Sequence, residues 1–470
     1  MGTREREVTR SVVTVPAEHP LEVLTALRSA LSGEGPAVMP VVVGGASRRG
    51  GFGRVPRRVA VVIETSGSTD VPKRVMLSTD ALLASAAASS VALGGPGQWL
   101  LPLPAHYIAG VQVLVRSIAA ETTPIIMPTG HFDPAAFTDH AEMLTEPLRF
   151  TSLVPTQLAR LADAAATDPR ILAAVRRFTG ILVGGQAVPP ALVARAAALD
   201  FRVVRTYGSS ETAGGCVYDG VSIGNTEVRI VDGELEISGA VLAEGYLGDP
   251  KRTADRFIDV HGVRWYRTGD LGEVDAATDE VRVLGRADSV IISGGEKVSL
   301  DAVERVVRSL PGLEEAIVVR ADDAEWGQVP VVVVPVDPVE SVEPVVPVDS
   351  VDSVDSVEPV VPVDLVDRVD SVDSVDPVDS VDSVDPVVPV DPVVEPVETP
   401  HPVATPHPVA TPHLVETPAL AQIREAVASV LGKAARPVRL VTVPAIPLLA
   451  SGKPDRQALQ SLIRTSATQQ

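Results

Sequence analysis

Cysteine is almost absent from this sequence: Cys216 is the only one among 470 residues. An intramolecular disulfide is therefore excluded, which suits a reducing compartment. A chain of this length can bury a large apolar core without cross-links, and it should divide into two or more domains.

Long apolar runs are also missing. Prolines interrupt the valine-rich residues 329–336, and residues 111–120 contain Arg116. Neither run reaches the roughly 18 apolar residues that a membrane-spanning helix needs. Residues 1–7 mix both charges and precede no apolar signal segment. We therefore expect a cytoplasmic protein with no membrane span and no secretory signal.

Positive charge is scarce, with 40 Lys and Arg against 61 Asp and Glu and a net charge of −21. Residues 335–418 account for most of this imbalance, because they contain 19 acidic residues and one basic residue, Arg368. The rest of the chain is close to neutral and lacks the basic surface that nucleic-acid binding requires. We expect no nucleic-acid partner.

Residues 335–418 consist of short units such as Val-Asp-Ser-Val-Asp-Pro and later Thr-Pro-His-Pro-Val-Ala. Their period is far below that of a solenoid repeat, and 17 prolines disfavour a continuous helix or a central strand. We predict an extended, disordered, low-complexity insertion. A binding tail stays open as the alternative, whereas carboxylates without a converging backbone disfavour a specific metal site.

Elsewhere, strand and helix patterns alternate. Apolar runs at 59–63, 178–183 and 201–204 predict strands, and residues 21–31, 81–91 and 191–199 predict helices. This alternation of strands and helices favours an α/β fold with parallel strands, whose ligands bind at the carboxyl ends of the strands. Short alternating runs from 221 to 284 predict a β-rich part with hairpins, and a smaller α+β unit follows residue 286.

The predicted strand at 59–63 leads into Thr65-Ser66-Gly67-Ser68-Thr69-Asp70-Val71-Pro72-Lys73. The hydroxyl groups can donate to phosphate oxygens, Gly67 allows close approach of backbone amides, and Lys73 supplies a cation. The stretch is not the G-x-x-x-x-G-K-[ST] loop, and by itself it fits a polar turn equally well.

Four more clusters could carry chemistry. Gly184-Gly185-Gln186-Ala187 suits a flat ligand or a simple glycine turn. Tyr207-Gly208-Ser209-Ser210-Glu211-Thr212 offers an aromatic ring, hydroxyls and a carboxylate for Mg²⁺, or a helix start capped by Ser209 or Ser210. Trp265-Tyr266-Arg267-Thr268-Gly269-Asp270 predicts a strand that ends in a turn, where Asp270 could accept ribose hydroxyls or only terminate a hairpin. Lys453 lies between Gly452 and Pro454, where a lysine is usually surface charge.

Five stretches of the chain resemble, in this order, the successive motifs of the adenylate-forming superfamily of acyl-CoA ligases, adenylation domains and luciferases: Thr65–Lys73, Tyr207–Thr212, Tyr266–Asp270, Gly285-Arg286-Ala287-Asp288 and Ser451–Lys453. The resemblance implies a large N-terminal domain, residues 1–286, and a small mobile C-terminal lid, residues 287–470, with a hinge at Asp288. It also implies an enzyme that uses ATP, Mg²⁺ and coenzyme A to join a small carboxylic acid to a thiol. A homodimer stays open.

The resemblance carries roles to individual positions. The residues implied to bind ATP are, at the phosphates, Thr65, Ser66, Gly67, Ser68, Thr69 and Lys73, at the adenine, Gly185, Gln186 and Tyr207, and at the ribose, Asp270 and Arg286. At the reacting groups they are Thr212 for the α-phosphate, Glu211 for Mg²⁺, Lys453 for the carboxylate and α-phosphate, and His106 for the border of the acyl pocket. Taken without the family, His106 is better interpreted as a core histidine.

Residues 104–117, 150–157 and 214–220 are similar to the branch of the superfamily that acts on o-succinylbenzoate, an acid of menaquinone biosynthesis. Another aryl or acyl acid is the alternative. The phosphate loop departs from the superfamily pattern, because Asp70 and Arg74 replace two glycines. Asp70 puts a negative charge beside an anion site, so we expect a slower enzyme. A nucleotide-binding protein of weak activity, with residues 335–418 as a docking linker, is the alternative from another class.

Overall fold

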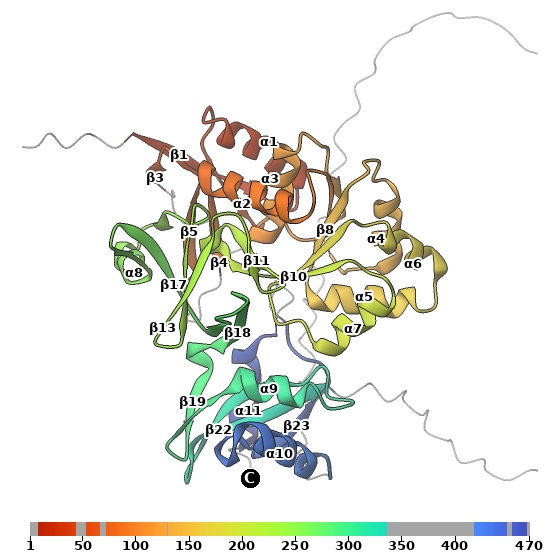
Figure 1. Ribbon diagram of the computed structural model, residues 1–470, viewed down its shortest axis with the longest axis vertical. Coiled ribbons are helices and arrows are strands. Elements are labelled where there is room, and N and C mark those ends of the chain that lie inside the picture. Colours follow the sequence, from red (N-terminus) through yellow and green to blue (C-terminus); the bar gives the residue numbers. More distant parts are fainter. Residues whose placement is uncertain are drawn as a thin grey trace, which may run out of the picture. The chain divides into compact units, whose positions relative to one another are not determined.

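The computed structural model describes residues 8–43, 53–65, 72–128, 130–335, 418–448 and 454–467. Within these ranges the chain forms four β-sheets with accompanying helices, in agreement with the predicted α/β class (Figure 1). The same ranges contain no helix that is both long enough and apolar enough to cross a membrane.

The first sheet contains the strand that precedes the predicted phosphate loop. Its strands follow the order β15-β5-β4-β2-β1-β3, and β1, β2 and β4 are parallel. Their bounds are β1 (Thr9–Pro16), β2 (Ala37–Val41), β3 (Arg54–Pro56), β4 (Val59–Thr65), β5 (Lys73–Ser78) and β15 (Gly245–Tyr246). Residues 59–63 of β4 are fully buried, because neighbouring strands and packed side chains cover both faces. This position explains the continuous apolar run in the sequence.

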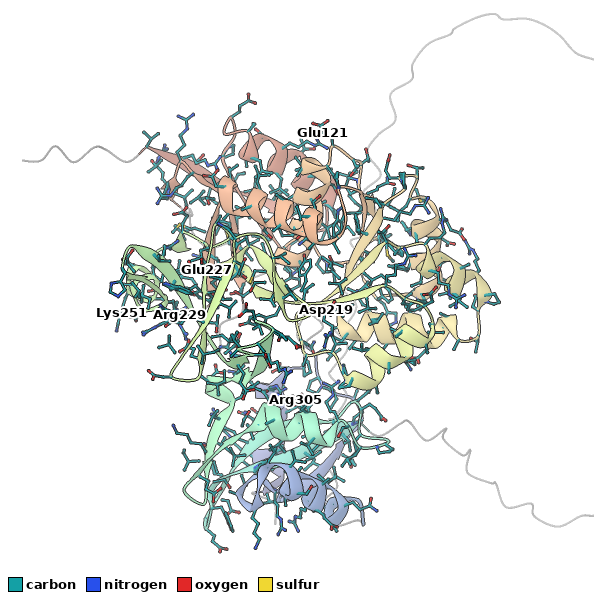
Figure 2. The ribbon with its side chains drawn as sticks, viewed as in Figure 1. Glu121, Asp219, Glu227, Arg229, Lys251 and Arg305 are labelled. Atoms are coloured by element: carbon teal, nitrogen blue, oxygen red, sulfur yellow. The ribbon has the colours of Figure 1, made fainter. Side chains whose placement is uncertain are left out.

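The second sheet follows the order β12-β11-β10-β9-β8-β6-β7. Its bounds are β6 (Gln98–Leu101), β7 (Ile125–Ile126), β8 (Arg149–Leu153), β9 (Gly180–Val183), β10 (Val203–Ser209), β11 (Gly214–Tyr218) and β12 (Val221–Ser222). Strands β6 to β10 pair in parallel, as predicted, whereas β11 and β12 are antiparallel. At the turn between β11 and β12, Asp219 accepts hydrogen bonds from the backbone and guanidinium of Arg205 (Figure 2).

The third sheet is the predicted β-rich part. Its strands are β13 (Glu227–Val231), β14 (Glu234–Ser238), β16 (Phe257–Val260), β17 (Val263–Val274) and β18 (Val281–Arg286). The predicted hairpin is confirmed, since β13 pairs antiparallel with β14. The predicted turn at Asp270 is wrong, because β17 continues through it to Val274. Gly269 adopts a positive φ of 76°, and the register of β14 against β17 shifts nearby, so the glycine allows a bulge within the strand.

The fourth sheet comprises β19 (Val290–Ser293), β20 (Glu296–Ser299), β21 (Ile317–Asp323), β22 (Gly327–Pro335) and β23 (Arg439–Val443). Apolar residues on the two faces of β22 join different clusters: Val332 packs with α9 (Leu300–Val307) and α10 (Pro418–Leu431), and Val331 packs with α11 (Arg456–Ala467). The predicted insertion lies outside the described residues except at its two ends. Pro335 closes β22 and Pro418 opens α10.

Helices α1 (Pro20–Leu31), α2 (Thr79–Ala92) and α3 (Ile108–Ala119) share one apolar cluster with the first sheet. The helices of the cluster around the second sheet are α4 (Pro134–Glu142), α5 (Pro155–Ala165), α6 (Pro169–Arg176) and α7 (Pro190–Ala198). Helix α8 (Pro250–Arg256) precedes β16, and the short 3₁₀ turns are η2 (Ser210–Thr212), η3 (Ala287–Ser289) and η4 (Lys433–Ala435). Proline at the first position of most of these helices costs no hydrogen bond and presets the helical φ.

Candidate active site

The stem of the predicted phosphate loop is the antiparallel pair of β4 and β5. Thr65 lies opposite Lys73, and Glu64 lies opposite Arg74. The loop itself, with the predicted residues Ser66, Gly67, Ser68 and Thr69 and the substituted Asp70, lies outside the described residues. The stem nevertheless fixes where the two ends of the loop begin.

The two stem pairs lie on opposite faces of the first sheet, because successive residues of a strand alternate and directly opposed residues share a face. On one face, the Lys73 ammonium lies 2.7 Å from Oε1 of Glu211. On the other, Nε of Arg74 donates to Oε2 of Glu64 at 2.9 Å. The cation that replaces a glycine of the family pattern therefore points away from the face that carries Lys73.

Replacing Arg74 by alanine should lower the free energy of unfolding by about 0.2–1 kcal/mol, the usual range for a cross-strand ion pair. The KM for ATP should stay within about twofold, because the removed side chain lies on the face opposite Lys73. Urea unfolding and an ATP titration check the two parts. A rise in KM for ATP of about tenfold would mean that Arg74 reaches the nucleotide.

Glu211 is the centre of the described site. The turn η2 that carries it is capped by Ser209, whose hydroxyl accepts from the Glu211 backbone N–H at 3.2 Å, so the capped start predicted from the sequence is present. The Glu211 side chain is only 2% exposed. Its Oε1 accepts from the Lys73 ammonium at 2.7 Å and from the Tyr246 hydroxyl at 2.8 Å.

The charge of Glu211 is maintained by these two donors. Burial alone would raise the pKa of the carboxyl, but Lys73 and the Tyr246 hydroxyl bring it below its ordinary value. Burial and the adjacent carboxylate in turn raise the pKa of Tyr246, so its hydroxyl stays protonated and donates. Glu211 is thus an anion at neutral pH, as a ligand of Mg²⁺ must be.

The hydroxyl of Thr212 is engaged within the turn. It accepts from the Ser209 backbone N–H at 2.8 Å and lies 2.8 Å from the Gly214 carbonyl oxygen, to which it donates. Ala213, with a φ of 50°, and Gly214 then reverse the chain into β11. The predicted contact of Thr212 with the α-phosphate remains a prediction, and its hydroxyl would have to exchange partners to make it.

Tyr207, predicted at the adenine, contacts Asp270, and so does Arg286; both Asp270 and Arg286 were predicted at the ribose. The Tyr207 hydroxyl donates to Oδ2 of Asp270 at 2.7 Å, and the Arg286 guanidinium donates to Oδ1 at 3.1 Å. Burial raises the pKa of Asp270, and Tyr207 and Arg286 only partly oppose it. Arg286 also pairs with Asp288, the predicted hinge residue.

Two predicted nucleotide residues carry buried polar atoms without a hydrogen-bond partner in the described part of the chain: Oγ1 of Thr65 and Nε2 of Gln186. Gln186 follows β9 beside Gly185, whose φ of 82° makes the turn, and Gly184 abuts Thr206 of β10. Buried polar atoms normally find partners, so such orphans indicate a missing polar ligand. The residues present therefore fit a bound nucleotide.

The side of α3 that faces β11 presents a second set of incompletely paired polar groups. Gln112 donates from Nε2 to the Ala213 carbonyl at 2.7 Å, but its Oε1 is buried without a partner among the described residues. One turn further, the buried Arg116 lies over the Trp99 ring and 3.4 Å from the Tyr218 hydroxyl, and its Nε also lacks a partner there. Burial lowers the pKa of the Arg116 guanidinium and the Tyr218 hydroxyl opposes this, and an arginine keeps its charge in proteins. No carboxylate of the described residues pairs with it.

His106 lies just before α3 and is half-buried. Burial lowers the pKa of its imidazole, a carboxylate at Glu18 opposes this only in part, and its ring lies 3.9 Å from that of Tyr107. The described contacts do not join His106 directly to Glu211 or Thr212. The link runs through α3, because Gln112 of that helix bonds to Ala213.

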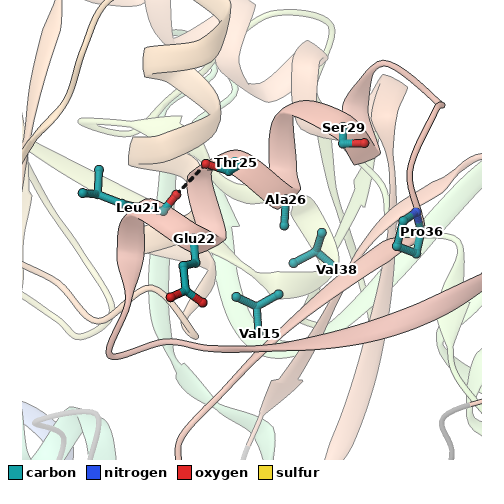
Figure 3. Close-up of a pocket in the computed structure, with 8 residues that line it drawn as sticks. All are labelled: Val15, Leu21, Glu22, Thr25, Ala26, Ser29, Pro36 and Val38. Atoms are coloured by element: carbon teal, nitrogen blue, oxygen red, sulfur yellow. Dashed lines mark hydrogen bonds between the residues drawn. The ribbon is translucent and has the colours of Figure 1, made fainter. Parts of the chain in front are cut away.

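A hollow of about 440 Å³ is lined in part by Tyr246, Thr253 and Phe257, and hollows away from these residues contribute little to the site. One of about 550 Å³ lies between α1 and strands β1 and β2, lined mainly by apolar side chains such as Val15, Leu21 and Val38, and it contains none of the predicted residues (Figure 3). Nor do the described residues form a group of three or more His, Cys, Asp or Glu suited to a metal. A Mg²⁺ ion at Glu211 would thus depend on phosphate oxygens for further ligands, its usual arrangement in nucleotide sites.

The structure therefore joins Thr65, Lys73 and Glu211 in one group, and Tyr207, Asp270 and Arg286 in another. Lys453 lies outside the described residues. Tyr246 was not among the residues predicted from the sequence, and Arg116 had no predicted role. A tyrosine after glycine and an arginine inside an apolar helix were the only local signals, and neither points to a ligand without the tertiary contacts.

Part of the chain is similar to known proteins. Residues 21–247 match the AMP-binding enzyme family. A protein of Mycobacterium tuberculosis named probable 2-succinylbenzoate–CoA ligase is 38% identical over 317 residues, which are 66% of this chain and 80% of that protein. The 2-succinylbenzoate–CoA ligase of Salmonella typhimurium is 31% identical over 290 residues, 59% of this chain and 58% of that protein.

Solved structures share the fold. The o-succinylbenzoate CoA synthetase of Bacillus subtilis, in complex with the acyl-adenylate intermediate, has a TM-score of 0.58 and 22% identity, and the match covers 86% of this chain and 69% of that one. ATP-bound MatB of Rhodopseudomonas palustris has a TM-score of 0.63 and 18% identity, with 98% and 80% covered. The predicted adenylate-forming fold is thereby confirmed.

Proposed function

The chain belongs to the AMP-binding enzyme family, and from that premise we propose that it is an AMP-forming ligase that joins 2-succinylbenzoate to coenzyme A. In the first half-reaction a carboxylate oxygen of the acid attacks the α-phosphate of ATP, giving acyl-adenylate and pyrophosphate. In the second, the thiol of coenzyme A attacks the acyl carbon, giving the thioester and AMP. The observation that carries the proposal is the 38% identity over most of the Mycobacterium tuberculosis relative. The reaction places the protein in menaquinone biosynthesis.

The described residues support the first half-reaction. Two anions must approach each other in line, so preplaced cations and donors lower the barrier. Lys73 and Thr65 lie on one face of the sheet where the phosphate loop begins and ends, and the Lys73 ammonium contacts the Glu211 carboxylate. When bound at Glu211, Mg²⁺ would neutralise charge on the phosphate oxygens. Asp270 would accept the ribose hydroxyls, and Lys453 would contact the carboxylate and α-phosphate.

The position and charge of Arg116 favour a substrate with two carboxyl groups. 2-Succinylbenzoate carries one carboxyl group on its ring and one on its succinyl chain, and only one of them is activated. Gln112 bonds beside Thr212, and Arg116 lies one helical turn away on the same face of α3. A buried guanidinium without a carboxylate partner among the described residues would receive the second carboxylate.

We further propose residues 1–286 and 287–470 as the large domain and the lid, with Asp288 as the hinge. The proposed boundary falls between β18, the last strand of the third sheet, and β19, the first of the fourth. Rotation there would withdraw Lys453 after adenylation and make room for the thiol.

Pyrophosphate release in the presence of ATP, Mg²⁺ and a panel of acids tests the proposal. Release should require 2-succinylbenzoate, and benzoate, succinate or fatty acids should give little. A different acid that supports faster release would transfer the proposal to another acid–CoA ligase. Absence of release with every acid, from folded protein, would favour a nucleotide-binding protein of another kind.

Joining Pro335 to Pro418 through a short Gly/Ser linker should leave both half-reactions within about threefold of the full chain, because loop closure depends only weakly on loop length. Separate assays of pyrophosphate release and of thioester formation from supplied adenylate check this. A large loss in a folded deletion variant would show that residues 336–417 contribute to the reaction.

A further inference from the structure

Two donors share a single oxygen of Glu211. The Lys73 ammonium and the Tyr246 hydroxyl both reach Oε1, at 2.7 and 2.8 Å. Within the described part of the chain, no hydrogen bond to Oε2 accompanies them. The carboxylate is thus anchored through one oxygen, and the other is left to take a different partner.

The two donors differ in how firmly they are held. The Lys73 side chain is 27% exposed and stands at the end of the phosphate loop, so it can leave Glu211 for an incoming phosphate. Tyr246 is 4% exposed and lies on β15, which pairs with β5 through Val75. Its backbone N–H donates to the Thr253 hydroxyl at 2.9 Å, and its ring packs against Phe257 with centroids 5.8 Å apart.

A phosphate and Glu211 compete for the same ammonium group. When Lys73 moves to the phosphates, a buried carboxylate without its cation would be costly and free to rotate unless another donor remains. Tyr246 supplies that donor, because its hydroxyl is fixed by backbone pairing and ring packing and does not depend on the nucleotide.

We propose, on the basis of the proposed function, that Tyr246 is a positioning residue for the metal-binding carboxylate. Its hydroxyl holds Oε1 of Glu211 throughout, so that Oε2 stays directed to the Mg²⁺ site while Lys73 passes from Glu211 to the phosphates. The Lys73–Glu211 ion pair is then the resting arrangement of the ligand-free enzyme, and the Tyr246–Glu211 bond is the permanent one.

The test is Tyr246→Phe, which keeps the ring and removes the hydroxyl. The Mg²⁺ concentration for half-maximal pyrophosphate release should rise about tenfold or more, as for other groups that orient a metal ligand. Calorimetry gives a readout independent of turnover: the gain in ATP affinity on adding Mg²⁺ should shrink about tenfold, and ATP affinity in EDTA should change little. The KM for the acid should not move.

Tyr218→Phe is the matched control. It removes the hydroxyl of another buried tyrosine, which lies 2.7 Å from the Ser89 hydroxyl, and leaves the Tyr246–Glu211 bond in place. Its Mg²⁺ dependence should equal that of the wild type. Equal shifts in the two variants, or an unchanged Mg²⁺ dependence in Tyr246→Phe, would overturn the proposal.

A second comparison distinguishes the loss of the Tyr246–Glu211 bond from a general loss of structure. In a Glu211→Gln background, Tyr246→Phe should cause no further change in the Mg²⁺ effect on ATP binding, and a further change would contradict the proposal. The calorimetric arm needs no acid. If the wild type bound MgATP but activated none of the acids, the proposed function would fail while the role of Tyr246 would still be decided.

Discussion

A Glu211→Gln variant should form acyl-adenylate at least about a hundredfold more slowly than the wild type, the loss typical of removing one preorganised electrostatic group. Glutamine keeps the shape of the side chain and an oxygen that can accept from Lys73 and Tyr246. It removes the charge that a magnesium ligand needs and that Lys73 neutralises at 2.7 Å. Single-turnover pyrophosphate release measures the effect.

The loss should be confined to the first half-reaction. Thioester formation from supplied acyl-adenylate should fall much less, because it does not require pyrophosphate to leave. Glu64→Gln is the matched control, since Glu64 lies at the same loop stem but on the face opposite Lys73. It should retain adenylation within about threefold. Similar losses in both variants would remove the special role of Glu211.

An Arg116→Met variant should lose about a hundredfold in kcat/KM for 2-succinylbenzoate, mainly through KM, as expected when a buried partner of a charge is removed. Wild-type enzyme should prefer the diacid to an analogue in which the second carboxyl is a methyl ester, and the variant should lose this preference. The substitution removes the packing of the guanidinium on Trp99 and its 3.4 Å contact with the Tyr218 hydroxyl, so the unfolding free energy of the ligand-free protein should fall by about 2 kcal/mol or less. The guanidinium leaves no carboxylate behind among the described residues, and its Nε lacks an acceptor there.

Arg10→Met is the control for burial of an arginine. The Arg10 guanidinium donates to the carbonyl oxygens of Val59, Ala30 and Gly35, so its removal would leave these acceptors without their donor. This variant should lose stability without a change in preference between diacid and monoester. If Arg116→Met also kept the preference, Arg116 would be a structural residue.

Much of the fold follows from local pattern. The buried run of β4 and the amphipathic helix α1 were predictable because burial imposes a period that the sequence records. The end of strand β17 was predicted wrongly for an equally local reason. Gly269 and Asp270 are typical turn residues, but pairing with β14 and β18 keeps the chain extended through them. Tertiary pairing decided this element and turn propensity did not.

The site was predictable only where order along the chain carries information. Glu211 and Asp270 were identified because their motifs follow one another as in the adenylate-forming superfamily. Contacts between distant residues leave no such trace, and Lys73 and Glu211 are 138 positions apart. For the same reason neither the Tyr246 hydroxyl on Glu211 nor the lack of a carboxylate partner for Arg116 among the described residues could be predicted from composition or spacing.

Mass spectrometry of the products formed from ATP, Mg²⁺ and 2-succinylbenzoate, before and after coenzyme A is added, tests the proposed ligase reaction directly. We expect an acyl-adenylate and pyrophosphate in the first sample, and the 2-succinylbenzoyl thioester with AMP in the second. Folded protein that binds ATP but yields neither the adenylate nor the thioester would contradict it.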